Sequence, residues 1–447
     1  MKYDFIVVGA GPAGLFACYD LLRASKKSKI ALVEMGKRMG KRRRNEVMSG
    51  FGGAGTFSDG KLTLTANLSH EKAFHLINKN KYQKLLDEVD TILTEFGVDS
   101  EYYPKETKEL NDLVLESKRN DVELVLRKAR HVGTDKLRDV MEKFQDHLLE
   151  SKVEILDSMK VTDLIVENNV VKGVKTDKGD LLSKKVLLAP GRVNAKWLQN
   201  LSDMYDIEYI YDKVEVGVRV EFPSSIMQKQ ADTLYETVYR VRTKTYHDIV
   251  RTFCSCPNGM VSTEKYDGYV CVNGHSNSDH ISENSNFAFL CEVNLTRPVE
   301  NSIAYAKSIA EVASTIGGGK PILQSLEDLR YGRRSTESRL EKSFVTPSLD
   351  IEEVTPGDIS MALPYRIVVN ILEGLEILDK VMPGINCGST LLYAPEVKFR
   401  SSRTKTNRDM QTSVKGLYVA GDGAGLSGSI TGAAVTGLMA AKGMLKS

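Results

Sequence analysis

The sequence lacks the features that mark a metal-binding, disulfide-rich or membrane-spanning protein. Its six cysteines form no C-x-x-C pair, and a chain of 447 residues needs no disulfide bonds to support its core. No apolar run reaches the roughly 18 residues that span a bilayer, and the first apolar strand begins too early to leave room for a signal peptide. We therefore expect a cytoplasmic protein with reduced thiols, no metal and no transmembrane segment.

A strong excess of charge of either sign is also missing. Lysine and arginine together number 61 and aspartate and glutamate 59, which gives a formal net charge of +2. This balance argues against attraction of the whole protein to nucleic acid. With 41% hydrophobic and 27% charged residues and no polar low-complexity tract, the composition is that of a soluble globular protein, which excludes neither an enzyme nor a binding protein.

Residues 3–34 have the pattern of a dinucleotide-binding βαβ unit. An apolar, β-branched run over residues 3–8 is typical of a buried parallel strand. It leads into G-x-G-x-x-G, whose glycines permit a tight turn, close approach to a pyrophosphate and close helix packing: Gly9, Gly11 and Gly14. Pro12 suits the first turn of the following helix, whose N-terminus offers N–H groups and a positive dipole end to an anion.

The same unit ends in an acidic residue where a ribose is expected. A second apolar strand over residues 29–33 ends at Glu34, 20 residues after Gly14, where a carboxylate meets the ribose 2′-OH. G-x-G-x-x-G alone is weak evidence. The complete order of strand, turn, helix, strand and acid is a strong indication of a dinucleotide site.

A basic stretch and a second glycine-rich segment follow. Residues 37–44 hold six lysines and arginines, which fit a solvated loop, a nucleic-acid patch, or arginines that neutralise a pyrophosphate or bind an anionic substrate. The position directly after Glu34 favours the cofactor, with Arg42 as the candidate. Residues 50–60 hold five glycines, which disfavour helix and strand, so we expect a loop whose backbone approaches a flat ligand.

The remainder of the chain alternates between helical and strand patterns. Helices are predicted at 82–96 and 136–149, a strand meander at 153–156, 161–167, 170–176 and 181–189, further strands at 214–222 and 269–272, and a helix stop at 317–319. At the C-terminus, a short apolar strand from residue 416 ends in Gly421 and Asp422, and a helix of small residues runs to 445. Residues 212–410 contain no second G-x-G-x-x-G.

The N-terminal unit, the meander ending in Ala189-Pro190-Gly191 and the C-terminal Gly421-Asp422 together resemble the two-dinucleotide-binding-domain flavoproteins. More narrowly, they resemble the glutathione-reductase superfamily members that bind only FAD. The resemblance implies non-covalent FAD, with Glu34 on the adenosine ribose, Asp422 on the ribityl chain, and the following helix N-terminus at the flavin pyrimidine. The implied cofactor-binding residues are Gly9, Gly11, Pro12, Ala13, Gly14, Glu34, Arg42, Gly53, Ala54, Gly55, Thr56, Ala189, Gly191, Gly421, Asp422, Gly428, Ser429 and Ile430.

Longer strings resemble a bacterial family of largely uncharacterised FAD-dependent dehydrogenases along nearly the whole chain. They are residues 52–62 (GGAGTFSDGKL), 131–137 (HVGTDKL), 253–257 (FCSCP), 332–336 (GRRST), 390–393 (TLLY) and 396–399 (EVKF). The sequence departs from that family at Arg130, where proline is usual, and at residues 255–258, where Met-Cys-Pro-Gly is more common. These departures put any transfer of a substrate from the family in doubt.

The expected fold is α/β, with a Rossmann-like FAD-binding domain of the glutathione-reductase type and an inserted mixed α/β substrate domain. Residues 1–70, 128–205 and 411–447 are expected to form the FAD-binding domain, residues 71–127 a helical insertion, and residues 212–410 the substrate or cap domain.

Candidate catalytic residues are polar groups in apolar or glycine-rich surroundings. Asp59 and Lys61 follow the second glycine loop, where Asp59 is either a proton relay or a turn former. Glu396 and Lys398 alternate on a predicted strand and so share one face, as an acid/base pair or a structural ion pair.

Several other residues have two interpretations each. Three arginines, at 333, 334 and 339, either anchor an anionic substrate or form interdomain salt bridges. His131 and His275 are proton carriers or structural histidines, and Cys254 and Cys256 are packing residues or a redox pair.

We therefore expect an FAD-dependent oxidoreductase that transfers a hydride between flavin and an unidentified small organic substrate, with anionic compounds as one candidate class. NAD(P)H is a possible transient electron donor. The alternatives are a single-component flavin monooxygenase and a non-catalytic FAD-binding module. Neither the substrate nor the oligomeric state follows from the sequence.

Overall fold

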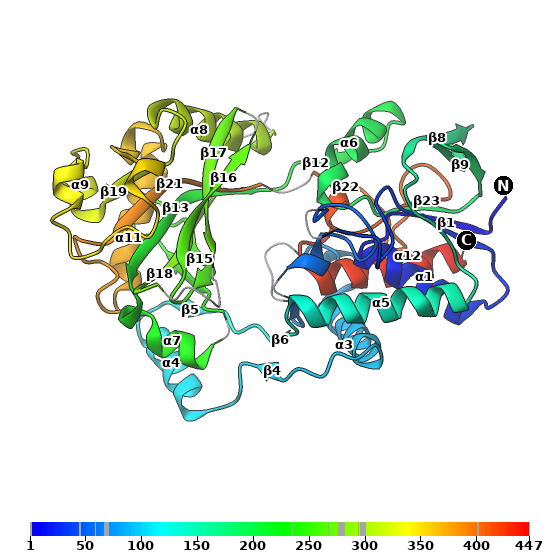
Figure 1. The fold of residues 1–447 in the computed structure, drawn as a ribbon, viewed down its shortest axis with the longest axis horizontal. Coiled ribbons are helices and arrows are strands. Elements are labelled where there is room, and N and C mark those ends of the chain that lie inside the picture. Colours follow the sequence, from blue (N-terminus) through cyan, green and yellow to red (C-terminus); the bar gives the residue numbers. More distant parts are fainter. Residues whose placement is uncertain are drawn as a thin grey trace. The chain divides into compact units, whose positions relative to one another are not determined.

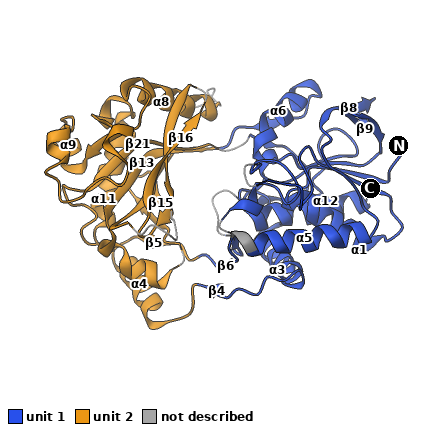
Figure 2. Ribbon diagram, in the orientation of Figure 1, with its two compact units in different colours: residues 1–103, 127–212, 401–447 blue, residues 104–126, 213–400 orange. Residues whose placement is uncertain are grey.

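The computed structural model describes residues 2–43, 46–58, 60–66, 71–234, 236–266, 268–275, 282–293, 295, 301–399 and 402–446. The chain forms two compact units (Figure 2). Unit 1 comprises Met1–Tyr103, Arg127–Asp212 and Ser401–Ser447, and unit 2 comprises Pro104–Leu126 and Lys213–Arg400. Each unit has its own hydrophobic core, so each is described by itself.

Unit 1 is built on a five-stranded parallel sheet (Figure 1). Its strand order is β23 (Leu417–Val419), β11 (Val186–Leu188), β1 (Phe5–Val8), β2 (Ile30–Val33) and β7 (Glu154–Leu156). Every residue of β1 and β2 is buried, as the continuous apolar runs predict for parallel strands covered on both faces. The α/β class predicted from the sequence is confirmed.

Helices and small sheets complete unit 1. The helices are α1 (Pro12–Ala24), α2 (Phe74–Ile77), α3 (Lys79–Glu95), α5 (Thr134–Glu150), α6 (Ala195–Met204) and α12 (Ile430–Lys446). Antiparallel sheets are formed by β8 (Val161–Glu167), β9 (Val170–Thr176) and β10 (Gly179–Leu182), by β3 (Lys61–Thr63), β6 (Ala129–His131) and β4 (Tyr102–Tyr103), and by β12 (Tyr209–Ile210) and β22 (Arg403–Thr404). The two ends of the chain meet here, because α12 packs along α1.

The predicted four-strand meander is wrong at both of its ends. Its first strand, β7, pairs in parallel with β2, and the run 181–189 splits into β10 and β11. β11 then pairs in parallel with β1. Sequence periodicity cannot distinguish these pairings, because a short apolar strand fits either a parallel or an antiparallel neighbour.

Unit 2 has an eight-stranded mixed sheet (Figure 1). Its order is β20 (Thr355–Pro356), β19 (Ile322–Ser325), β21 (Leu391–Lys398), β13 (Val214–Pro223), β18 (Asn284–Val293), β15 (Ile249–Cys256), β14 (Tyr239–Arg242) and β5 (Glu123–Leu124), with β16 (Met260–Tyr266) and β17 (Tyr269–His275) as a separate hairpin. The helices are α4 (Lys108–Arg119), α7 (Gln228–Thr233), α8 (Ser302–Ile316), α9 (Leu326–Arg330), α10 (Glu337–Leu340) and α11 (Tyr365–Leu378). The predicted helix stop at 317–319 follows α8 directly.

Residues 71–127 do not form the single helical insertion expected from the sequence. The part up to Tyr103 belongs to unit 1, whereas Pro104–Leu126 belongs to unit 2. The reason is local packing in unit 2: β5 adds an edge strand beside β14, and Leu110 and Leu113 of α4 bury against Leu234. Among the described residues, no helix combines the length and the apolar character needed to cross a membrane.

Candidate functional site

The segments predicted to bind the cofactor leave the same edge of the parallel sheet. Strands β1, β11 and β23 end at Val8, Leu188 and Val419, next to one another. A Cβ atom added at Gly9 would overlap the carbonyl of Ala189, and one at Gly423 would overlap the backbone of Gly191. Ligands of open α/β sheets bind outside the carboxyl ends of such strands.

The second glycine loop lies directly on the first. The N–H of Gly52 donates to the carbonyl of Ala10 at 2.8 Å. A Cβ atom at Gly53, whose φ is +70°, would lie 3.0 Å from the Cα of Gly11. Gly11 is the N-cap of α1 and no described side chain caps this helix. Two glycine loops and an uncapped helix N-terminus are thus brought together.

Glu34 joins these segments through its carboxylate. One oxygen accepts the N–H of Ala10 at 2.8 Å, and the other accepts the N–H groups of Gly36 at 2.8 Å and Gly50 at 2.9 Å. The side chain is buried, with 7% of the residue exposed. Glu34 therefore holds both glycine loops in place, a role that the motif did not predict, and its contact with a ribose stays a prediction.

Arg42 also holds the second glycine loop. Its guanidinium donates to the carbonyls of Val47 at 2.8 Å, Phe51 at 2.7 Å and Gly53 at 2.9 Å. Burial lowers the pKa of Arg42 to about 10, although the nearby carboxylate of Glu34 opposes this shift. Within the basic stretch, Arg42 is therefore buried rather than solvated. A direct contact of Arg42 with a pyrophosphate stays a prediction.

Asp422 follows β23 and lies beside an arginine. Its Oδ2 accepts from the Nε of Arg192 at 3.0 Å and from a terminal nitrogen of the same guanidinium at 2.8 Å. The Arg192 side chain is 63% exposed, so this ion pair is open to solvent. The N–H of Gly421 donates to Thr436 Oγ1 at 2.9 Å, which fixes the turn before Asp422 on α12.

The N-terminus of α12 contacts a buried carboxyl group that the sequence analysis missed. Glu71 accepts hydrogen bonds from the hydroxyls of Ser429 at 2.7 Å and Tyr82 at 2.6 Å. Burial raises the pKa of Glu71 to about 7, although both hydroxyls oppose the shift. Glu71 lies outside every motif, so no sequence signal marked it. Glu71 lies at the N-terminus of α12, where the family resemblance predicts the flavin pyrimidine.

Two buried hydroxyls near these loops lack a hydrogen-bond partner among the described residues. They are Thr56 Oγ1, in the short helical turn after Gly53, and Ser427 Oγ, just before α12. Unsatisfied buried hydroxyls are uncommon and call for an explanation. Together with the glycine cradle, they fit a polar ligand such as FAD.

The structure describes only some of the candidate catalytic residues that follow the second glycine loop. Asp59 lies outside the described residues. Lys61 begins β3 and pairs in register with His131 on β6. His275 ends β17 in unit 2, apart in sequence and in unit from this pair.

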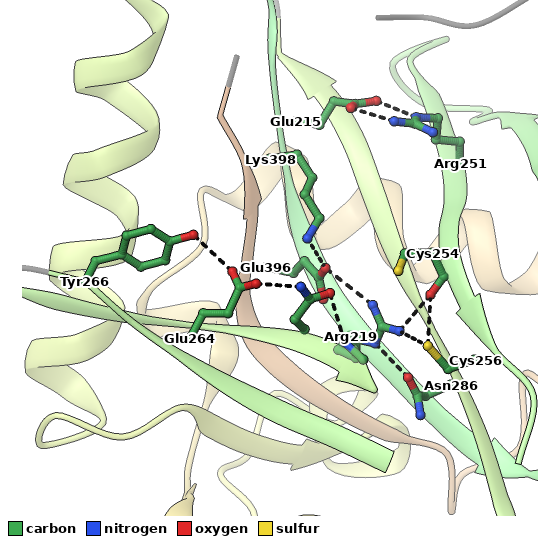
Figure 3. Close-up of polar contacts among 12 residues, drawn as sticks. Glu215, Arg219, Arg251, Cys254, Cys256, Glu264, Tyr266, Asn286, Glu396 and Lys398 are labelled. Atoms are coloured by element: carbon green, nitrogen blue, oxygen red, sulfur yellow. Dashed lines mark hydrogen bonds and ion pairs between the residues drawn. The ribbon is translucent and has the colours of Figure 1, made fainter. Parts of the chain in front are cut away.

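The predicted pair Glu396 and Lys398 lies on β21 in unit 2, with the two groups on one face (Figure 3). Lys398 Nζ contacts Glu396 Oε1 at 2.8 Å. Glu396 is fully buried, and its Oε2 has no hydrogen-bond partner among the described residues. Burial by itself would lower the pKa of Lys398, but Glu396 opposes this and the net shift is upward. The lysine is therefore a cation beside a buried carboxyl group.

Arg219 lies at the centre of the same cluster, and the sequence analysis missed it. This residue of β13 is fully buried and donates to Asn286 Oδ1 at 2.8 Å, the carbonyl of Cys254 at 2.7 Å and Cys256 Sγ at 3.3 Å. Glu396 Oε1 lies 3.4 Å from its guanidinium. An arginine flanked by valines within a predicted strand was the available signal, since a buried charged residue needs a partner.

Arg333 and Arg339 bind within unit 2. Asp328 contacts Arg333 at 2.5 Å and Arg339 at 3.6 Å, and it belongs to the same unit. The prediction of interdomain salt bridges is therefore wrong for these two arginines, because their carboxylate partner lies in the same unit. Their contact with a substrate stays a prediction.

Comparisons with known proteins give one sequence relative and several structural likenesses. An uncharacterised protein of Clostridium beijerinckii is 25% identical over 481 residues, which cover 99% of this chain and 80% of that protein. Quinol fumarate reductase FrdA of E. coli matches with a TM-score of 0.44, 12% identity and coverage of 100% of this chain and 70% of that chain. Glycine oxidase of Bacillus cereus matches with a TM-score of 0.40, 13% identity and coverage of 100% and 95%. At these scores the likenesses carry no information on activity.

The family comparison concerns the second unit. Residues 213–399 match the family model described as "FAD-dependent protein, C-terminal domain-like". These residues nearly coincide with the longer segment of unit 2, Lys213–Arg400. Unit 2 is thus similar in sequence to a C-terminal domain of FAD-dependent proteins.

Proposed function

We propose that the protein is an FAD-dependent oxidoreductase that transfers a hydride between a non-covalently bound flavin and a small organic substrate. The observation that supports this most is the contact between the two glycine loops, where Gly53 lies on Gly11 at the N-terminus of α1. The match of residues 213–399 to a domain of FAD-dependent proteins supports the same cofactor. The bound flavin would supply the hydride chemistry.

The residues of unit 1 hold and orient the cofactor in this proposal. Gly9, Gly11 and Gly14 let the pyrophosphate approach the backbone, and the N–H groups at the start of α1 neutralise its charge. Glu34 keeps the two glycine loops in register, and Arg42 holds the second loop. Asp422 accepts a hydroxyl hydrogen bond from the ribityl chain, while Thr56 and Ser427 offer hydroxyls that have no partner among the described residues.

Proton transfer is assigned to charged groups in each unit. Lys398 holds a proton next to the buried carboxyl group of Glu396, which favours its cationic form. Lys61, beside the second glycine loop, is the candidate of unit 1. An anionic substrate fits these cationic side chains. A nicotinamide donor would bind only transiently, since residues 212–410 contain no second dinucleotide-binding motif.

The cofactor assignment is tested on the purified full-length protein. We expect a yellow protein with the absorbance of an oxidised flavin, and release of FAD rather than FMN on denaturation, identified by chromatography. A folded protein that stays colourless after incubation with FAD would overturn the proposal.

The reaction class is tested after the cofactor is established. Anaerobic photoreduction of the bound flavin, followed by mixing with a panel of organic acceptors, should give reoxidation by one chemical class without oxygen. NADH and NADPH are tested separately as donors. A flavin that reoxidises only with oxygen and yields a hydroxylated product would instead identify a monooxygenase.

A further inference from the structure

The two closely spaced cysteines of unit 2 lie in an unusual backbone environment at the end of β15. The pairing of β15 with β18 shifts register between Phe253 and Cys256, which marks a β-bulge. Cys254 adopts a left-handed φ of +48°, which is rare for a non-glycine residue. Bulges re-aim side chains, and strained residues of this kind concentrate at functional sites.

The spacing of the pair is compatible with a disulfide bond. Residues i and i+2 of an extended strand are about 6.6 Å apart at Cα, within the range of roughly 4.4–6.8 Å in which disulfides form. In this structure, Cys256 Sγ lies 3.6 Å from the carbonyl oxygen of Cys254, so the second sulfur is already folded back toward the first residue.

The two sulfurs differ in access and in electrostatic environment (Figure 3). Cys254 is partly exposed, whereas Cys256 is 5% exposed and receives a hydrogen bond from Arg219 at 3.3 Å. A guanidinium donor favours a thiolate over a thiol. The hydrogen bond with Cys256, together with burial, raises the pKa of Cys254, while Arg219 and Lys398 oppose that shift. Cys254 is thus the more exposed of the two residues, and the sulfur of Cys256 lies beside a fixed cation.

We propose that Cys254 and Cys256 form a redox-active dithiol that exchanges with small organic disulfides. In the first step, Cys254 Sγ gives its proton to solvent, attacks a disulfide RSSR as the thiolate, forms a mixed disulfide and expels RS⁻. In the second step, Cys256 Sγ attacks Cys254 Sγ, breaks the mixed disulfide and expels a second RS⁻. The two thiol protons pass to the two expelled thiolates, so two protein thiols and RSSR become one protein disulfide and two RSH. This activity is independent of the proposed flavin chemistry.

The asymmetry between the sulfurs gives a sharp test with oxidised glutathione as the probe. The folded full-length protein is incubated with it, the remaining thiols are alkylated, and the products are mapped by mass spectrometry. The wild type should lose two alkylatable thiols, mapped to an intramolecular Cys254–Cys256 bond. Cys256→Ser should accumulate a glutathione adduct at Cys254, whereas Cys254→Ser should react at least ten-fold more slowly at the buried Cys256.

Cys387 provides the matched control because it is an exposed free cysteine with no contact to Cys254 or Cys256 among those described. Cys387→Ser should form the same intramolecular bond as the wild type. The proposal is overturned if Cys254 and Cys256 remain fully alkylatable in the folded wild type, if thiol loss maps only to Cys387, or if the bond forms only in denaturant. The wild-type measurement alone tests whether Cys254 and Cys256 form the bond, even if a serine variant fails to fold.

Discussion

The carboxylate of Glu34 accepts the backbone N–H of Gly50 at 2.9 Å, and through this bond the acid at the end of β2 fixes the start of the second glycine loop. The same carboxylate accepts N–H groups from Ala10 and Gly36. Glu34, which the motif predicts to bind a ribose, is thus part of the scaffold of the protein itself.

Substitution of Glu34 should therefore weaken the fold itself. Glu34→Gln turns an acceptor-only group into one whose amide N–H₂ faces backbone donors, which should lower the free energy of unfolding by about 1–3 kcal/mol. Urea unfolding of the FAD-free protein measures this change. As a control, Glu46→Gln, whose carboxylate contacts Lys37 near the surface, should change stability by less than about 0.5 kcal/mol. Equal stability of Glu34→Gln and wild type would leave Glu34 with a ligand-binding role alone.

Gly53 should be intolerant of any side chain. Gly53→Ala places a Cβ atom 3.0 Å from Gly11 Cα at a φ of +70°, which should cost about 1–3 kcal/mol. Because Gly11 must shift to make room for the Cβ atom, FAD binding measured by flavin fluorescence should weaken as well, and each 1.4 kcal/mol of lost binding free energy is ten-fold in affinity. Gly40→Ala is the matched control, because its φ is +77° and nothing lies within 4 Å of the added Cβ. Equal losses in the two variants would show that backbone strain alone is responsible.

Glu71 should make the stability of the protein depend on pH between about 4.5 and 7. Its pKa is raised from 4.5 to about 7 in the folded state, so the folded protein binds more protons than the unfolded chain in this window. Stability should therefore be highest below the unfolded value and fall as pH rises through about 7, by roughly 3 kcal/mol at most. Urea unfolding across this range measures the slope.

Glu71→Gln should remove the contribution of Glu71 to the pH dependence of stability, because glutamine does not titrate. Its stability should change less than that of the wild type between pH 5 and 7.5. Parallel stability curves for the two proteins would contradict the assignment. Tyr82→Phe removes one hydrogen bond to the carboxyl group of Glu71. Because that bond favours the charged form, its loss should raise the pKa of Glu71 in the folded protein and extend the pH range over which stability falls.

The buried pair in unit 2 should behave as a coupled unit. Lys398→Met leaves Glu396 buried without the contact at 2.8 Å, and the loss of one partner of a buried pair typically costs about 3–5 kcal/mol. Lys398 is 21% exposed and Arg219 remains 3.4 Å from Glu396, so we expect the lower end of that range.

A double-mutant cycle measures this coupling. Glu396→Gln with Lys398→Met should be more stable than the sum of the single losses predicts, because neither member of the Glu396–Lys398 pair is left without the other. Additive losses would indicate that the two side chains act independently. If the pair transfers protons as proposed, Lys398→Arg should retain most of the stability while the pH profile of turnover shifts.

The sequence by itself determined the parts of this protein that depend on local rules. The βαβ unit of residues 3–34 follows from strand runs, glycine spacing and helix-start chemistry, all of which act between neighbours in the chain. The alternation that puts Glu396 and Lys398 on one face follows from the two-residue period of a strand. The α/β class follows from the order of these patterns.

The tertiary structure decided which distant segments meet. Glu71 reaches the start of α12, Arg219 reaches Cys256, and Pro104–Leu126 joins unit 2, in each case across a sequence separation that no local period encodes. Glu34 acquired its scaffold role in the same way, because it binds backbone N–H groups of both glycine loops, which meet only in the packed fold. A buried polar side chain takes the partners that the packed fold brings within reach, and these partners are set by long-range packing rather than by spacing along the chain.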